Sequence, residues 1–308
     1  MDHTDVRDGL EAVAVGLLTP FDDHAVDHAA LAENAGALAS RGVETFLACA
    51  NISEYHSLTH EERVAVTETS VDALPAAACV LAGVGGSTSA ACELAAAFDS
   101  LGVDALMVMP PDHTYRHERG LLTYYRSIAE ATATPIVPYV RGYHPSVEFL
   151  AALTELEGVV GVKYAIADPV TLSQAVAAGD DDVVWVDGLA EPYALAFYAQ
   201  GAASFTAGVT NFEPRLGLAL LEALEDGDFE RARALQNLAI PYQRFRAEAG
   251  EGNTLADANS VPAVKYGLEL AGLHGGPVRP PIVDLSDAEK RRAETLYEEL
   301  QEGLDELL

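Results

Sequence analysis

The stretch Val159-Val160-Gly161-Val162-Lys163-Tyr164-Ala165-Ile166 decides how this sequence folds. Its apolar, β-branched character predicts a buried strand, and a lysine lies near the strand's end. Lysine is scarce in the chain, which contains only Lys163, Lys265 and Lys290. Burial disfavours the charged ammonium and lowers the lysine pKa toward the range in which a neutral amine attacks a carbonyl. Lys163 is therefore the candidate nucleophile, and the competing interpretation is a strand that ends at a surface lysine.

Apolar runs of this kind recur along the chain, and helix-like stretches follow them. This is the pattern of repeated βα units around a parallel sheet. The predicted strands are residues 13–18, 45–50, 79–84, 105–109, 136–140, 159–164, 183–186 and 203–207. Eight strands alternating with helices predict an α/β fold, the (β/α)8 TIM barrel, whose catalytic groups collect at the carboxyl ends of the strands.

Helices are predicted both between these strands and after the last one. Those between the strands include 28–40, 61–74, 89–101, 121–131 and 146–156, with Thr59, Thr88 and Ser146 as capping residues. After Pro214 the sequence predicts only helices, at 215–224, 229–246, 261–271 and 287–302. We therefore expect a catalytic barrel over residues 1–224 and a C-terminal α-helical extension over residues 225–308.

The chain is strongly acidic, with a formal net charge of -30 at pH 7 and a sequence pI near 4.4. Such a charge repels phosphates, which excludes nucleic acid and anionic membranes as partners. The carboxylates are spread along the chain, which predicts adaptation to concentrated salt, where counter-ions screen repulsion within about 3 Å at 1 M. No stretch reaches the roughly 18 apolar residues of a membrane span, and the acidic N-terminus is unlike a signal peptide. We expect a cytoplasmic protein.

Polar residues follow several of the predicted strands, at the same rim as Lys163. Imine formation needs a proton shuttle, and a tyrosine on the adjacent strand end can serve, which makes Tyr139 the candidate. The alternative is a rim tyrosine that only packs. Arg141 follows the same strand, and its planar fork suits a distal carboxylate or hydroxyls of a substrate; the alternative is a surface ion pair.

The remaining predicted substrate-binding residues are Asn51, Ile52, Ser53, Gly188 and Asn211. Among them, the backbone N–H groups around Asn51 and Ile52 are predicted to bind the C1 carboxylate. His56, His113 and His144 could also line the mouth of the barrel, although most isolated histidines are neither ligands nor catalysts. These histidines have no metal-ligand spacing, and we expect neither a metal nor a cofactor.

Several motifs follow one another in the order of a known family. They are Gly16-Leu17-Leu18-Thr19-Pro20-Phe21, Glu54-x-x-Ser57-Leu58-Thr59-x-Glu61-Glu62, Gly83-Val84-Gly85-Gly86-Ser87-Thr88, Gly102-Val103-Asp104-Ala105, Pro138-Tyr139, Gly161-Val162-Lys163, Asn211-x-x-Pro214 and Gly276-Pro277-Val278-Arg279-Pro280-Pro281. Over essentially its whole length the chain resembles the dihydrodipicolinate synthase and N-acetylneuraminate lyase superfamily of class I lyases. The resemblance implies a barrel with a C-terminal helical domain, usually a homotetramer. It also implies that Lys163 forms an imine with a 2-keto acid substrate while Tyr139 shuttles the proton.

The sequence departs from the dihydrodipicolinate synthases at three places. Ala50-Asn51-Ile52-Ser53-Glu54 replaces the usual Gly-Thr-Thr-Gly-Glu, and an asparagine side chain cannot relay a hydroxyl proton. Pro111-Asp112-His113 replaces the paired aromatic Pro-Tyr-Tyr, and no Gly-Arg-Thr follows Tyr139. These departures argue against a role in lysine biosynthesis.

Three other features are similar to the branch that acts on 2-keto-3-deoxy sugar acids, particularly the 5-dehydro-4-deoxyglucarate dehydratases. They are Glu54-Tyr55-His56-Ser57-Leu58-Thr59, the pair Tyr139-x-Arg141, and Asn211-Phe212-x-Pro214. The first hypothesis is a metal-independent Schiff-base aldolase that cleaves or forms an acyclic 2-keto-3-deoxy sugar acid, with pyruvate as the keto-acid half. A dehydratase that uses the same imine is the alternative. A keto-acid-binding barrel without activity and a metal-dependent aldolase are further alternatives.

Overall fold

The computed structural model describes residues 3–23 and 25–308, so Met1, Asp2 and His24, which fall in the predicted barrel range 1–224, lie outside it. The strands of the main sheet are β1 (Ala14–Gly16), β4 (Thr45–Ala48), β5 (Cys79–Val84), β6 (Ala105–Val108), β7 (Ile136–Val140), β8 (Gly161–Tyr164), β9 (Val184–Asp187) and β10 (Ser204–Phe205). They are hydrogen-bonded in that order, and a parallel bridge between Ala14 and Thr206 joins the first strand to the last. The fold is a (β/α)8 TIM barrel with a C-terminal α-helical extension, as the sequence predicts.

All eight predicted strands are present, and several are shorter than the apolar runs that predicted them. The strand β4 ends at Ala48 because Cys49 adopts a positive φ of 52°, which turns the chain out of the ladder. The loop that follows holds the predicted residues Asn51, Ile52 and Ser53. The ends of the ladders are thus set by the backbone of the rim loops rather than by hydrophobicity.

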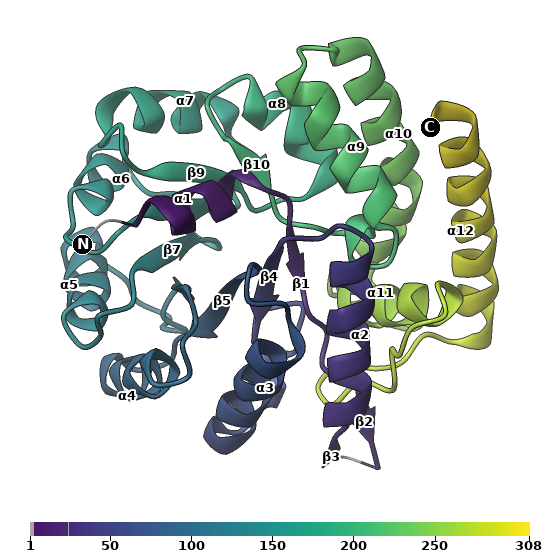
Figure 1. The fold of residues 1–308 in the computed structure, drawn as a ribbon, viewed down its shortest axis with the longest axis horizontal. Coiled ribbons are helices and arrows are strands. Elements are labelled where there is room, and N and C mark those ends of the chain that lie inside the picture. The colour runs from purple at the N-terminus through teal and green to yellow at the C-terminus, as the bar shows by residue number, and fades with distance from the viewer. Residues whose placement is uncertain (1–2, 24) are drawn as a thin grey trace. The chain divides into compact units, whose positions relative to one another are not determined.

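Helices follow most strands, and Figure 1 labels them in chain order. They are α2 (His28–Ser40), α3 (His60–Ala73), α4 (Thr88–Asp99), α5 (Glu118–Ala129), α6 (Val147–Thr154), α7 (Pro169–Ala178) and α8 (Ala194–Tyr198). The predicted caps Thr59 and Ser146 are confirmed, since each side chain accepts a hydrogen bond from the first turn. The prediction that Thr88 caps α4 is wrong. The N-cap residue is Ser87, which has an extended backbone conformation and whose hydroxyl accepts a hydrogen bond from the N–H of Ala90.

The sequence did not predict several elements. They are α1 (Thr4–Glu11), α7, α8, the short antiparallel hairpin of β2 (Phe21–Asp22) and β3 (Ala25–Val26), and the 3-10 turns η1 (Tyr55–Ser57), η2 (Glu191–Tyr193) and η3 (Val209–Asn211).

The contacts between residues gather into two units. One unit comprises residues 3–14, 44–47 and 77–206, and the other comprises residues 15–23, 25–43, 48–76 and 207–308. The first unit holds Lys163 and Tyr139, whereas the second holds the loop after β4 and the C-terminal helices. The division into a barrel at 1–224 and a helical domain at 225–308 stays a prediction.

In the first unit, α1 lies across the amino ends of the strands. The hydroxyl of Thr45, which begins β4, donates to the carbonyl of Gly9, and the hydroxyl of Ser204, which begins β10, donates to the carbonyl of Leu10. Leu10 also packs against Gly161, the first residue of β8. Figure 1 shows α1 beside β9, in agreement with the contacts between the two elements. The helix therefore covers the strand ends opposite to Lys163.

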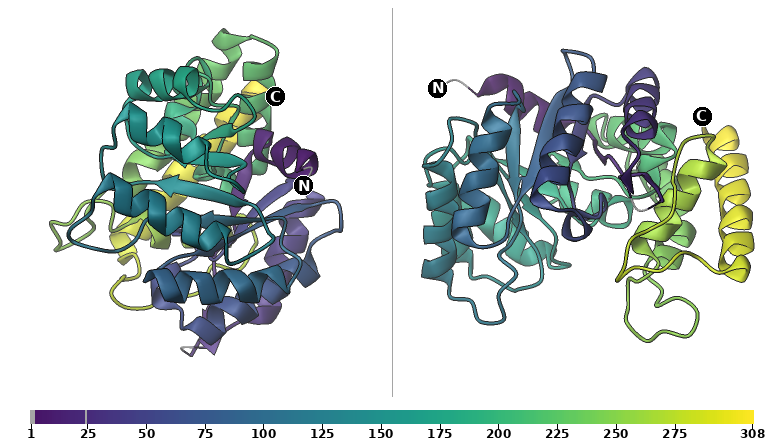
Figure 2. Two further views of the ribbon diagram at one scale, coloured as in Figure 1. Left: turned by 90° about the vertical axis from the view of Figure 1, so that its left-hand side faces the viewer. Right: turned by 90° about the horizontal axis from the view of Figure 1, so that it is seen from below.

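In the second unit, four C-terminal helices pack together: α9 (Pro214–Glu225), α10 (Phe229–Arg246), α11 (Ser260–Leu270) and α12 (Asp287–Leu307). The helix α10 contacts the other three, and Figure 2 shows α12 running along this group. The rings of Phe212 and Tyr242 contact each other at a tilt of 54°, with 4.8 Å between centroids, and the Tyr242 hydroxyl donates to the carbonyl of Ala263. None of the helices in residues 3–23 and 25–308 is long and apolar enough to cross a membrane.

Gly161→Ala should destabilise the protein, because a Cβ there would lie 2.6 Å from Leu10 Cδ1 and 3.0 Å from the Val184 carbonyl oxygen. Overpacking of this kind costs about 1–3 kcal/mol. Gly120→Ala in α5 is the matched control, because a Cβ there meets no atom within 4 Å and alanine favours a helix. Denaturant unfolding of both variants gives the comparison. Equal stability of the two variants would contradict the packing of α1 against β8.

Candidate active site

Lys163 and Tyr139 lie together at the carboxyl ends of two neighbouring strands. The two residues pair in register across β7 and β8, so both side chains project from the same face of the sheet. Lys163 is only 8% exposed and Tyr139 is buried. The lysine Nζ lies 4.4 Å from the centre of the tyrosine ring. The two residues predicted to be catalytic are therefore neighbours in the structure.

The surroundings of Lys163 favour its neutral form. The pKa of the lysine is lowered to about 7, mainly by burial and also by the positive charge of Arg141, while Asp187 opposes the shift. Arg141 is exposed, and its Nη1 lies 3.5 Å from the Tyr139 hydroxyl oxygen, which is a long contact. A large fraction of Lys163 is thus unprotonated near neutral pH, as an imine-forming amine requires.

Asp187, the last residue of β9, is a buried carboxyl that the sequence analysis did not single out. It is 1% exposed, and its Oδ1 accepts the N–H of Leu189 at 2.7 Å. Its Oδ2 has no hydrogen-bond partner among the described residues. Burial raises the pKa of this carboxyl well above its usual range, and the positive charge of Lys163 opposes that shift.

Gly188, a predicted substrate-binding residue, lies against the stem of Lys163. A Cβ at this position would lie 2.7 Å from the Cβ of Ala165 and 3.2 Å from Cγ of Lys163. Only glycine leaves room for the lysine side chain here. The observed role of Gly188 is therefore to make space beside the nucleophile.

Asn211, Ile52 and Ser53 belong to the second unit, where they surround the end of β1. The Gly16 N–H donates to Asn211 Oδ1 at 3.0 Å, and a Cβ at Gly16 would collide with Ile52 Cγ2. The Nδ2 of Asn211 is buried and has no partner among the described residues. The amide is thus fixed by its oxygen, while its nitrogen remains available as a donor.

The loop of Asn51, Ile52 and Ser53 is held by its own hydrogen bonds. The hydroxyl of Ser53 accepts a hydrogen bond from the Ala50 N–H at 3.1 Å. The backbone carbonyl of Ser53 accepts a hydrogen bond from the Thr19 hydroxyl at 2.7 Å. Ser53 is buried, so its side chain supports the loop, whereas Asn51 and Ile52 are partly exposed.

A buried ion pair anchors the end of this loop, and the sequence analysis did not predict it. The Nζ of Lys265 lies 2.6 Å from Glu54 Oε1, with the two side chains 2% and 0% exposed. Lys265 also donates to the Pro277 carbonyl, and the backbone N–H of Arg279 donates to Glu54 Oε2. The one available signal was the scarcity of lysine, because a chain with three lysines places each of them selectively.

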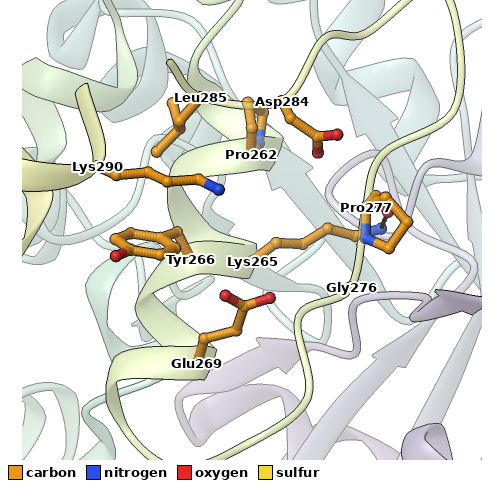
Figure 3. Close-up of a pocket in the computed structure, with 9 residues that line it drawn as sticks. All are labelled: Pro262, Lys265, Tyr266, Glu269, Gly276, Pro277, Asp284, Leu285 and Lys290. Atoms are coloured by element: carbon orange, nitrogen blue, oxygen red, sulfur yellow. Dashed lines mark hydrogen bonds between the residues drawn. The ribbon is translucent and has the colours of Figure 1, made fainter. Parts of the chain in front are cut away.

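A pocket of about 210 Å³ lies beside Lys265, as Figure 3 shows. In this view the side chain of Lys265 extends toward Pro277, and Lys290 reaches over the ring of Tyr266, with its Nζ 5.5 Å from the ring centre. The amine of Lys265 is occupied by Glu54 and the Pro277 carbonyl. It is therefore not a second free nucleophile, which leaves Lys163 as the buried lysine that can react.

The three histidines predicted as possible lining residues, His56, His113 and His144, are all exposed. The ring Nδ1 of His113 accepts the backbone N–H of Tyr115 at 3.0 Å, which stabilises the exposed loop after β6.

Comparisons with known proteins identify the family of this chain. Residues 10–300 match the model of the dihydrodipicolinate synthetase family. A probable 5-dehydro-4-deoxyglucarate dehydratase of Methylobacterium radiotolerans is 30% identical over 274 residues, covering 87% of this chain and 88% of the relative. A 4-hydroxy-tetrahydrodipicolinate synthase of Methanopyrus kandleri is 31% identical over 300 residues, covering 95% and 96%.

Among solved structures, the crystal structure of dihydrodipicolinate synthase from Oceanobacillus iheyensis has a TM-score of 0.91 and 30% sequence identity. The similarity covers 98% of this chain and 100% of that chain. The relatives are named as synthases and dehydratases of the lyase type. The chain therefore belongs to the dihydrodipicolinate synthetase family of class I Schiff-base lyases, and it is an enzyme.

Proposed function

We propose that this enzyme dehydrates an acyclic 2-keto-3-deoxy sugar acid through an imine on Lys163, with 5-dehydro-4-deoxyglucarate as the leading substrate. The observation that carries the proposal is the buried Lys163, with a pKa of about 7, paired in register with Tyr139. Support for the substrate class comes from relatives near 30% identity that are named as probable 5-dehydro-4-deoxyglucarate dehydratases, in Methylobacterium radiotolerans and in Rhodococcus opacus.

The proposed chemistry begins when the neutral Lys163 amine attacks the C2 carbonyl and water leaves. The resulting imine withdraws electrons, so that C3 loses a proton and the C4 hydroxyl departs as water. The conjugated imine then accepts the electron pair of the C5–C6 bond as the distal carboxylate leaves as carbon dioxide, and water hydrolyses the imine to release the product and free Lys163. The Tyr139 hydroxyl is the proposed proton shuttle during imine formation. Arg141, beside that hydroxyl, is the proposed partner of the distal carboxylate.

The C1 carboxylate is proposed to bind the N–H groups around Asn51 and Ile52. The buried Nδ2 of Asn211 is a further argument for a polar substrate. A buried N–H donor without an acceptor destabilises the folded protein by about 1–3 kcal/mol, and a hydrogen bond to a substrate oxygen would remove this penalty.

Aldol cleavage to pyruvate and an aldehyde is the second candidate. One observation favours it: the centre of the Tyr139 ring lies 4.4 Å from the Lys163 amine, and cleavage needs only one group to accept the C4 hydroxyl proton. Tetrahydrodipicolinate synthesis is disfavoured by Asn51 and by Pro111-Asp112-His113, which replace residues of those synthases.

We also propose a cytoplasmic homotetramer adapted to concentrated salt, on the basis of the -30 charge and the family resemblance.

The purified enzyme should convert 5-dehydro-4-deoxyglucarate to 2-oxoglutarate semialdehyde. A six-carbon diacid that gives this five-carbon product must also release carbon dioxide, which provides a second measurable product. Mass spectrometry of parallel incubations with 5-dehydro-4-deoxyglucarate and with 2-keto-3-deoxygluconate separates the two candidates. Pyruvate from either acid would favour aldol cleavage, and no product from either acid would overturn both proposals.

Borohydride should trap pyruvate covalently on Lys163, and Lys163→Ala should lose both trapping and turnover because the nucleophile is removed. Lys290→Ala is the matched control and should keep both, since the Lys290 amine lies over Tyr266 instead. Tyr139→Phe should slow imine formation by about 10²–10⁴-fold while the fold is kept. Peptide mapping locates the adduct, and an adduct on a residue other than Lys163 would contradict the assignment.

The rate of pyruvate imine formation should rise with pH and reach half of its maximum near pH 7, because the reacting amine has a pKa of about 7. Arg141→Gln removes a positive charge that disfavours the ammonium, so the midpoint should move to higher pH. Arg292→Gln is the control, because Arg292 pairs with Glu248 in the second unit and should leave the midpoint unchanged. Stopped-flow trapping from pH 5.5 to 9 measures the midpoints. A fall or no change in Arg141→Gln would rule out this charge effect.

A further inference from the structure

A second concave site lies within the first unit, at the amino ends of the strands. Its volume is about 620 Å³, the size range of pockets that hold small organic molecules. His3 and Arg7 of the α1 segment, Arg126 of α5, and Val159 and Val160 line it together with neighbouring residues. Val159 and Val160 precede β8, which carries Lys163 near its other end. The pocket is therefore separate from the imine site.

The two arginines in this pocket lack the carboxylate partners that Arg215, Arg231, Arg279 and Arg292 have. Within residues 3–23 and 25–308, no ion pair or side-chain hydrogen bond involves Arg7 or Arg126, and the Nε of Arg7 is buried without a partner.

A purely structural role does not explain this arrangement. Residues at the amino ends of barrel strands usually serve stability, and α1 does cover this end of the strands. A structural arginine would satisfy its donors with a carbonyl or a carboxylate, as Arg279 does with Glu62 and Ser57. The buried Nε of Arg7 lacks such an acceptor, which indicates that the acceptor comes from a bound molecule.

We propose that this pocket binds a small aliphatic monocarboxylate, with Arg7 and Arg126 holding the carboxylate and Val159 and Val160 contacting the carbon chain. Planar guanidinium groups match a carboxylate by paired hydrogen bonds. Glu130 and Glu157 also line the pocket, and both are exposed. Their charges disfavour a dense anion such as phosphate, whereas a single negative charge on an apolar body fits the mixture of arginines and apolar floor.

Titration calorimetry with hexanoate tests the proposal, because hexanoate has no keto group and cannot form an imine with Lys163. Wild type should show saturable binding, and Arg7→Gln and Arg126→Gln should each weaken it at least about tenfold, the scale of a lost charged hydrogen bond. Arg231→Gln is the matched control, since Arg231 pairs with Glu222 elsewhere, and it should bind as wild type does. Circular dichroism checks folding. If Arg7→Gln does not fold, the exposed Arg126 decides the result.

A second arm separates this pocket from the imine site. Enzyme whose Lys163 has been blocked by borohydride reduction with pyruvate should bind hexanoate with unchanged affinity. Loss of binding after blocking, unchanged affinity in the arginine variants, or no saturation in wild type would each overturn the proposal. Inorganic phosphate should bind more weakly than hexanoate, and equal affinity would overturn the assignment to an organic carboxylate. These experiments measure binding and not turnover of the sugar acid. A negative result would therefore overturn the carboxylate pocket and leave the proposed function unaffected.

Discussion

The proposed chemistry of this protein depends on the removal of water from one lysine ammonium. Lys163 occupies a barrel strand with apolar neighbours, and this burial is the largest cause of its lowered pKa. The neighbouring strands serve the same lysine: Tyr139 lies beside it in register, and Gly188 leaves room for its stem. A hydrated lysine would stay protonated at neutral pH, and the same residues would then have no nucleophile to assist.

The pair of Lys265 and Glu54 shows how the same chain uses a buried lysine for another purpose. Burial lowers the pKa of Lys265 as well, but the carboxylate at 2.6 Å and the Pro277 carbonyl keep its ammonium satisfied. Phe21 lies under the cations of both Lys265 and Arg279, at 4.4 and 4.1 Å from the ring centre. The difference between a reactive and a structural lysine is therefore the presence of a counter-charge within hydrogen-bonding distance.

Much of the fold could be predicted because buried strands leave a local signal of apolar, β-branched runs, and the neighbouring positions of Tyr139 and Lys163 followed from strand order. The helix α1 was missed because its eight residues are mostly polar, with only Val6 and Leu10 buried. Ser87 and Thr88 are equivalent capping residues by chemistry, so only the backbone conformation decides between them. The pair of Glu54 and Lys265 joins residues far apart in the sequence, and no local pattern encodes such a contact. The exposure of Arg141 likewise depends on the path of the loop after β7.

The anchoring of Glu54 limits how far the C-terminal segment can be treated as a separate module. Glu54 ends the loop that follows the second barrel strand, yet its carboxylate contacts the ammonium of Lys265 and the backbone N–H of Arg279. A barrel cut away from that segment would keep a fully enclosed carboxylate without a cation, which is among the most unfavourable defects a protein interior can hold. Exchange of C-terminal segments between relatives therefore requires that the helix lysine be kept wherever the loop glutamate is kept.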